Sequence, residues 1–275
     1  MQYKDIVTEI QDMRYLSWSK IRRSSGSAGS FLKAFEVKDG KKIYYKLSAF
    51  DPVNGITGHE CVNEIIADRL LSMLGIEHLH YRLIHAMVTI DGRDHETWLC
   101  ASEDFKDRGD SKVALDDYYE MNRFYGETPI DFCIRMGWDK YIYEMLLVDF
   151  LILNRDRHGA NIEILKNSRA GRVQPAPLFD HGMSFVCRCM NEDEVRRFDP
   201  LDDRPVQCFV GSRSSRDNLR LVPQGKRPAV RAIEERDRSL IFAGLEGILP
   251  PAYLDKIWDM IRERWNYYES LQDNR

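Results

Sequence analysis

The sequence has no long uninterrupted apolar run and no strong excess of charge of either sign. No stretch approaches the roughly 18 consecutive apolar residues that a membrane span requires, and the N-terminus leads into charged sequence without an apolar signal region. The formal net charge of -4 offers no general attraction to nucleic acid. These absences predict a cytoplasmic protein that neither crosses a membrane nor binds DNA.

Cysteine is also scarce, and the 6 cysteines are scattered along the chain. Such a distribution is unlike the dense framework of a small secreted disulfide protein, and it suits a reducing compartment. Cys187, Cys189 and Cys208, together with His181, are the candidates for a zinc site. Cys187 and Cys189 are separated by a single residue, which matches poorly the usual spacing of zinc-binding cysteines. The sequence therefore favours free thiols.

What is present is the composition of a folded globular protein: 43% hydrophobic and 31% charged residues in a chain of 275. A chain of this length can bury a substantial core, and it can form either one large domain or two lobes that meet at a cleft. Ligand sites favour such clefts.

The first hundred residues combine strand patterns with one prominent helix. Residues 5–16 carry apolar side chains at helical spacing, which predicts a short helix at the start of the chain. Residues 31–37 and 43–49 read as strands joined by a turn at Asp39 and Gly40. Residues 60–74 then predict a helix that ends at Gly75.

Two further strands, at residues 81–90 and 97–103 on either side of a turn at Asp91 and Gly92, complete the pattern of an antiparallel sheet with one helix. From Asp116 onward the pattern is mainly helical, with helices predicted over 138–153 and 253–271. A polar stretch at 106–110 separates the two regions. We therefore expect an α+β protein with an N-lobe at residues 1–105 and a mainly helical C-lobe at 106–275.

The segment Asn154-Arg155-Asp156-Arg157-His158-Gly159-Ala160-Asn161 directly follows the predicted apolar helix. Phosphoryl transfer needs a group that orients the attacking hydroxyl and oxygen ligands for magnesium. Asp156 and Asn161 have the same spacing as the aspartate and asparagine of a kinase catalytic loop. Taken alone, an Asp/Asn loop is more often a turn capped by its own side chains.

Asp180 supplies the context that changes this interpretation. It follows the apolar residues Leu178 and Phe179, precedes His181 and Gly182, and lies across a predicted hairpin from Asn161. This layout is similar to the metal-binding Asp-Phe-Gly segment of kinases, although the letters differ. Asp180 is accordingly the strongest candidate magnesium ligand in the sequence.

Lys46 and Glu64 are candidates for the phosphate-binding pair of an ATP site. Lys46 lies in a predicted strand and Glu64 in the helix that follows. In kinases a strand lysine paired with a helix glutamate contacts the α and β phosphates. Most strand lysines simply face solvent. The interpretation of Lys46 and Glu64 as an ATP-binding pair therefore depends on the motifs at residues 156–161 and at Asp180.

A run of small residues, Ser24 to Ser30, precedes the first hairpin and is followed by Lys33. Backbone amides and hydroxyls in such a run can surround phosphate, although a flexible linker is its ordinary explanation. The run lacks the Walker pattern Gly-x-x-x-x-Gly-Lys-Ser/Thr, which removes support for a Walker-type nucleotide site. Its candidate nucleotide contacts are Ser25, Gly26, Ser27, Ala28, Gly29, Ser30 and Lys33.

The order of these segments resembles the HipA-like serine/threonine kinases, and in particular compact, CtkA-like members of that family. The resemblance spans about residues 24–271, and its most specific part is the segment 154–161, which looks like the family's Asp-Arg-His-x-x-Asn catalytic loop. It implies a two-lobed protein-kinase-like fold that uses ATP and Mg²⁺. The chain starts almost at the phosphate loop, with no room expected for the extra N-terminal subdomain of full-length HipA, so partner binding by analogy with HipA is left open.

The resemblance also implies individual roles. Asp156 would be the catalytic aspartate, with His158 in the same motif, and Asn161 and Asp180 would bind magnesium. It implies further that ATP contacts come from Lys46, Glu64, Glu103 and Phe105, the last two beside the adenine, and that regulatory autophosphorylation falls on Ser24, Ser25, Ser27 or Ser30.

Three functions remain open from the sequence. The first is a protein serine/threonine kinase with an unknown protein substrate. The second is a nucleotide-binding pseudokinase or partner-binding regulator that keeps the pocket without turnover. The third is a small-molecule or phosphoinositide kinase, because the Asp-Arg-His-x-x-Asn motif also occurs in phosphoinositide kinases and does not select the acceptor.

Overall fold

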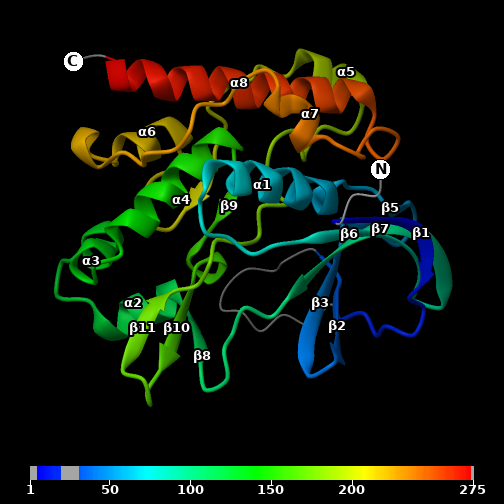
Figure 1. Cartoon of the computed structure of the whole chain (residues 1–275), viewed down its shortest axis with the longest axis horizontal. Coiled ribbons are helices and arrows are strands. Elements are labelled where there is room, and N and C mark those ends of the chain that lie inside the picture. Colours follow the sequence, from blue (N-terminus) through cyan, green and yellow to red (C-terminus); the bar gives the residue numbers. More distant parts are fainter. Residues whose placement is uncertain (1–4, 20–30, 274–275) are drawn as a thin grey trace.

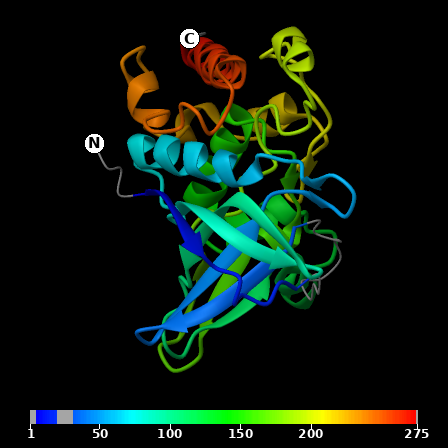
Figure 2. The same ribbon diagram turned by 90° about the vertical axis from the view of Figure 1, so that its right-hand side faces the viewer.

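The computed structural model describes residues 5–19 and 31–273. Its largest sheet has five strands in the order β1-β6-β7-β3-β2 (Figures 1 and 2). These strands are β1 (Ile6–Asp12), β2 (Lys33–Lys38), β3 (Lys41–Leu47), β6 (Arg82–Ile90) and β7 (Arg93–Glu103). All neighbours in this sheet run antiparallel except β1, which pairs in parallel with β6. A small hairpin, β4 (Phe50–Asp51) and β5 (Gly55–Ile56), follows β3.

Both long hairpins of this sheet have the tight turns that the sequence predicts. The turn between β2 and β3 has φ of 50° at Asp39 and 77° at Gly40, and the turn between β6 and β7 has 50° at Asp91 and 78° at Gly92. Two successive residues with positive φ are typical of a type I′ turn, whose twist matches that of the flanking strands. An Asp-Gly pair meets that requirement because both residues tolerate this conformation.

The helix predicted at residues 5–16 is wrong, because the chain forms strand β1 there. Ile6, Val7, Thr8 and Ile10 are β-branched, and such side chains favour extended backbone. Ile6 is buried, and β1 completes the edge of the sheet beside β6. The spacing of apolar residues resembled a helix, but pairing with β6 decided the structure.

Helix α1 (Glu60–Leu74) has the bounds that the sequence predicts. Gly75 ends it with φ of 71°, and its N–H donates to the carbonyls of Leu71 and Ser72. Figures 1 and 2 show α1 between the five-stranded sheet and the helices of the second half of the chain. Its apolar residues are almost entirely withdrawn from solvent, so α1 belongs to one continuous core with those helices.

The second half of the chain is mainly helical. Its helices are α2 (Leu115–Asn122), α3 (Pro129–Arg135), α4 (Asp139–Leu151), α5 (Glu192–Arg197), α6 (Ser215–Arg220), α7 (Asp237–Ile241) and α8 (Pro251–Asp273), with short 3-10 helices at Gly159–Asn161 and Gln224–Lys226. Strands β8 (Ser111–Ala114), β10 (Glu163–Asn167) and β11 (Arg172–Pro175) form a second sheet in the order β11-β10-β8. Two short strands, β9 (Asp156–Arg157) and β12 (Gln207–Cys208), pair in parallel.

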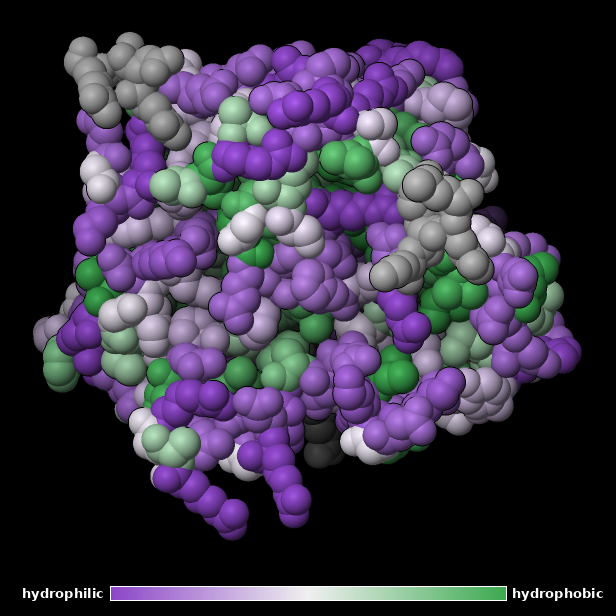
Figure 3. Space-filling view, viewed as in Figure 1, coloured by the Kyte–Doolittle hydropathy of each residue, from purple (hydrophilic) through white to green (hydrophobic). Residues whose placement is uncertain are grey.

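Two buried clusters hold these layers together. The larger cluster runs from α1 through α4 to α8, and the smaller one covers the opposite face of the five-stranded sheet. Hydrophilic residues dominate the face of the molecule that Figure 3 shows. Within the described residues, none of the helices has the length and apolar character needed to span a bilayer. The division into lobes at residues 106–110 stays a prediction.

Candidate active site

Three charged side chains from separate segments meet at one point. The Nζ of Lys46 on β3 lies 3.0 Å from the Oε1 of Glu64 on α1 and 2.5 Å from the Oδ1 of Asp180, which follows β11. Glu64 is fully buried and Lys46 is 9% exposed. A lysine between two carboxylates is thus fixed at the junction of the sheet, helix α1 and the loop after β11.

The charges in this triad shift one another's pKa values. Burial alone would lower the pKa of Lys46, but the carboxylates of Asp180 and Glu64 outweigh it and raise that pKa well above its usual range. Burial would raise the pKa of Asp180, yet the nearby Lys46 and Lys33 hold it below its usual range. Lys46 is therefore a cation and Asp180 an anion at neutral pH.

The loop that carries Asp180 is attached closely to α1. The backbone N–H of His181 donates to the Oε2 of Glu64 at 2.8 Å, and the Nδ2 of Asn63 donates to the carbonyl of Gly182 at 2.9 Å. A Cβ at Gly182 would lie 3.1 Å from the Cβ of Glu60, so a side chain there would crowd the helix. This contact explains why glycine follows the Asp180-His181 pair.

Asp156 and Asn161 lie in the loop after α4 and are joined directly. The Nδ2 of Asn161 donates to the backbone carbonyl of Asp156 at 2.8 Å, and the backbone N–H of Asp156 donates to the Oδ1 of Asn154 at 3.2 Å. The Nε2 of His158 lies 3.7 Å from the Oδ1 of Asp156. Asp156, His158 and Asn161 therefore each have a neighbour within the same loop.

Arg157 connects this loop to the Asp180 segment. Arg157 is 1% exposed, and its guanidinium forms two hydrogen bonds of 2.9 Å with the carboxylate of Asp149 on α4. It also donates to the carbonyls of Asn161 at 3.0 Å and Phe179 at 2.8 Å. Arg157 thus fixes the position of Asn161 relative to the residue that precedes Asp180.

A cavity of about 280 Å³ opens beside the Lys46 triad. Its lining includes five residues that the sequence singled out: Lys33, Lys46, Glu103, Phe105 and Asp180. The other lining residues are Tyr44, Tyr45, Leu79, Tyr81, Cys100, Ser102, Asp104, Lys112, Glu163 and Phe179. The rings of Phe105 and Phe179 have centroids 5.7 Å apart, and the Nζ of Lys112 lies 3.9 Å from the centre of the Phe105 ring. The cavity combines an aromatic wall with three lysines and four carboxylates, which suits a flat ligand that also carries charged groups.

The donor set near the catalytic loop fits magnesium. Asn161 uses its Nδ2 as a donor, and among the described residues no hydrogen bond reaches its Oδ1. Asp180 adds a carboxylate that is held ionised. Neutral and anionic oxygens are the ligands that Mg²⁺ prefers.

The structure brings most of the sequence candidates into two groups. The first group lines the cavity or belongs to the Lys46 triad, and its members are Lys33, Lys46, Glu64, Glu103, Phe105 and Asp180. The second group lies in the loop held by Arg157, and its members are Asp156, His158 and Asn161. The side chain of Glu103 points away toward solvent, where it pairs with Lys41. The candidates Ser24, Ser25, Gly26, Ser27, Ala28, Gly29 and Ser30 lie outside the described residues.

The sequence reasoning missed Asp149, Tyr81 and Lys112. Asp149 is a lone charge within the apolar stretch of α4, and a buried charge needs a partner. That signal could have pointed to Arg157. Tyr81 accepts a hydrogen bond from the backbone N–H of Asp180 at 3.2 Å, and Lys112 lies 2.8 Å from Asp104. Nothing in the local pattern indicated these last two contacts.

All 6 cysteines are free thiols, as the sequence favours. Within the described chain, Cys187, Cys189 and Cys208 do not converge with His181 on a common point that could hold a metal.

No protein-family model and no curated protein matches the sequence. Among solved structures, the proinflammatory kinase CtkA of Helicobacter pylori is similar over 94% of this chain and 95% of its own, with a TM-score of 0.59 and 16% sequence identity. HipA from the toxin–antitoxin system of Shewanella oneidensis MR-1, solved with HipB and operator DNA, matches over 97% of this chain and 70% of its own, with a TM-score of 0.48 and 15% identity. The likeness to CtkA shows that this chain has the kinase-like α+β fold expected from its sequence.

Proposed function

We propose that this protein is an ATP-dependent phosphotransferase, and specifically a protein serine/threonine kinase of the HipA-like, CtkA-like type. The observation that carries the proposal is the position of Lys46, held between Glu64 and Asp180 on the wall of a cavity large enough for a nucleotide base. A fixed cation beside an ionised carboxylate is the arrangement that phosphoryl transfer requires.

In this proposal the cavity binds the nucleotide. Phe105 and Phe179 would contact the adenine, and the backbone from Ser102 to Phe105 would supply polar atoms along its edge. Lys46 and Lys33 would face the phosphates. Binding there would redirect Lys46 from Asp180 toward phosphate oxygens, while Glu64 keeps the lysine in place.

Asn161 and Asp180 would hold Mg²⁺, which when bound neutralises charge on the phosphate oxygens. Asp156 would accept a hydrogen bond from the hydroxyl of the acceptor and orient it. Its side chain is about one-third exposed, at 34%, so an acceptor from solvent can reach it. His158 would assist by its position beside Asp156.

The test is transfer of labelled phosphate from ATP in the presence of magnesium, to the protein itself and to a generic protein acceptor. We expect transfer by the unmodified chain and a loss of at least about 100-fold in Asp156→Asn, within the range typical of removing a catalytic acid–base group. Asp193→Asn, on the exposed side of α5, is the matched control and should keep activity. Equal transfer by the unmodified chain and Asp156→Asn would reject the proposal.

The same experiment separates the alternatives. If ATP raises the melting temperature but no transfer is detected, the protein is a pseudokinase. Offering peptides, small alcohols and inositol lipids as acceptors distinguishes a protein kinase from a small-molecule or phosphoinositide kinase. Mass spectrometry after incubation with ATP and magnesium identifies the modified residue, and we expect it among Ser24, Ser25, Ser27 and Ser30.

A further inference from the structure

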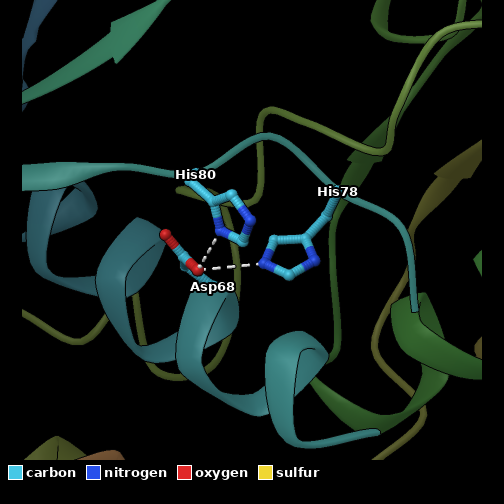
Figure 4. Close-up of side chains that lie close together, drawn as sticks. All are labelled: Asp68, His78 and His80. Atoms are coloured by element: carbon cyan, nitrogen blue, oxygen red, sulfur yellow. Dashed lines mark hydrogen bonds and ion pairs between the residues drawn. The ribbon is translucent and has the colours of Figure 1, made fainter. Parts of the chain in front are cut away.

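A second cluster of ligating groups lies outside the lining of the proposed nucleotide cavity, where α1 passes into β6. The Oδ1 of Asp68 on α1 lies 2.9 Å from the Nε2 of His78 and 3.1 Å from the Nδ1 of His80. Both imidazoles point at the same carboxylate oxygen, as Figure 4 shows. All three atoms lie within 4.8 Å of one another, and this is the one such group of histidine, cysteine and carboxylate side chains in the described residues.

The hydrogen bonds of His78 determine which of its nitrogens is available. Its Nδ1 lies 2.7 Å from the carbonyl of Ile76, and a carbonyl only accepts, so Nδ1 carries a proton. In the neutral imidazole, Nε2 then presents a lone pair toward the Oδ1 of Asp68. Two lone pairs 2.9 Å apart need an additional proton or another cation between them. The hydroxyl of Ser72 lies 3.3 Å from the Nε2 and 3.4 Å from the Oδ1, and its single proton can serve only one of the two.

The remaining contacts are those that metal sites also have. A backbone carbonyl on the second nitrogen is the usual partner of a metal-binding histidine, because it fixes the tautomer and the ring orientation. The other carboxylate oxygen of Asp68 accepts the backbone N–H of Tyr81 at 2.6 Å, which leaves Oδ1 directed at the imidazoles. The side chain of Asp68 is 11% exposed and that of His78 is 3% exposed, so two of the three groups are preorganised.

We propose that Asp68, His78 and His80 bind a divalent transition-metal ion of the zinc class. Two imidazole nitrogens and one carboxylate oxygen suit Zn²⁺, whereas Mg²⁺ and Ca²⁺ favour oxygen alone. With metal–ligand distances of roughly 2.0–2.2 Å, ligand atoms in a tetrahedral site lie about 3.3–3.6 Å apart. The separations of 2.9 and 3.1 Å between the Oδ1 of Asp68 and the two imidazole nitrogens would widen by roughly 0.2–0.7 Å to reach this geometry.

A fourth coordination position is open to solvent. The side chain of His80 is 75% exposed, and a cavity of about 430 Å³ borders Asp68, Ser72 and His80. The ion can therefore reach the site in the folded protein and complete its coordination with water. Three protein ligands with one open position is a known zinc arrangement.

The site connects two segments that also serve the Lys46 triad. Asp68 lies one helical turn after Glu64 on α1. His78 and His80 flank Leu79, whose N–H donates to the carbonyl of Leu178 at 2.8 Å, two residues before Asp180. Bound metal would fix α1 to the segment before β6, whose Leu79 and Tyr81 line the proposed nucleotide cavity. This inference does not depend on the proposed kinase activity.

The test is titration of the full chain with zinc chloride alone, without nucleotide, followed by calorimetry and by thermal unfolding. We expect one Zn²⁺ per chain and a higher melting temperature, because a ligand that binds only the folded state stabilises it. His80→Gln should weaken binding by at least about 10-fold, the lower limit seen when even an outer partner of a metal site is removed. His80 is exposed, so this variant will fold.

His85→Gln is the matched control. The Nε2 of His85 also lies 2.9 Å from a carboxylate, that of Glu96, but this pair has no third ligand, so the variant should keep full zinc affinity. A 100-fold excess of magnesium should not displace the zinc. The proposal is overturned if the unmodified chain binds no zinc at micromolar concentration, or if His80→Gln binds it equally well, which would place the ion elsewhere on the chain.

Discussion

Arg157 and Asp149 form a buried, doubly hydrogen-bonded ion pair, with both N–O distances at 2.9 Å. Asp149 belongs to helix α4 and Arg157 to the loop that contains Asp156 and Asn161. Because Arg157 also donates to the carbonyls of Asn161 and Phe179, this one pair fixes the loop to the helix and to the Asp180 segment. The position of the Asp156–Asn161 loop relative to Asp180 therefore depends on this ion pair.

Asp149→Ala should therefore destabilise the protein strongly. The substitution leaves the guanidinium of Arg157 buried without a countercharge, and breaking a buried pair in this way costs about 3–5 kcal/mol. Urea unfolding followed by circular dichroism measures the loss. Glu192→Ala, which removes the partner of the exposed Arg196, is the control and should cost under about 1 kcal/mol. Similar losses in the two variants would contradict the importance of the buried pair.

Lys46→Met should abolish most phosphate transfer, and it should also destabilise the protein, because it leaves Glu64 and Asp180 without their countercharge. Removing one fixed donor from developing negative charge lowers turnover by about 10²–10³-fold, and Lys46 is the buried cation of the triad. Transfer from labelled ATP, corrected for the folded fraction by circular dichroism, measures the effect. Lys41→Met breaks only an exposed pair with Glu103 and should leave turnover nearly unchanged. Equal activity of both variants would remove Lys46 from the reaction.

Gly182→Ala should destabilise the contact between the Asp180 loop and helix α1. The added Cβ would meet the Cβ of Glu60 at 3.1 Å and the Oε1 of Glu64 at 3.2 Å, and overpacking typically costs about 1–3 kcal/mol. Thermal unfolding reports the change, and phosphate transfer should fall with it. Gly225→Ala has no neighbouring atom within 4 Å of the new Cβ and should be close to neutral.

Acid should weaken the fold between neutral pH and about pH 4. Burial lowers the pKa of His59 to about 4 and that of His181 well below its usual range. Unfolded histidine titrates near pH 6.5, so below that pH the unfolded state binds more protons and stability falls by up to ~1.4 kcal/mol per pH unit for each histidine. The stability that these neutral histidines contribute is fully present above pH 6.5.

The check is urea unfolding at several pH values from 7 to 4.5. His59 packs edge-on against the ring of Tyr253, so His59→Phe keeps an aromatic contact and removes one titrating group. Its stability should depend less steeply on pH than that of the unmodified chain. An unchanged slope would show that His59 is not held neutral by its surroundings.

Much of the fold could be predicted because its signals are local. Two Asp-Gly turns, a helix that ends at Gly75 and the apolar stretch of α4 each follow from residues close in sequence, and the structure has all of them. The catalytic-loop motif at Asp156 to Asn161 was equally visible. The roles assigned to its residues stay predictions until transfer is measured.

The tertiary structure decided the rest, because those features depend on partners far apart in the chain. Residues 6–12 became a strand because β6 offered an edge, although their spacing suggested a helix. Asp149 pairs with Arg157, and Asp180 pairs with Lys46, because packing removes these charges from water and only an opposite charge compensates for the lost hydration. Asp68, His78 and His80 showed no motif in sequence, and the turn from α1 into β6 placed their ligand atoms together.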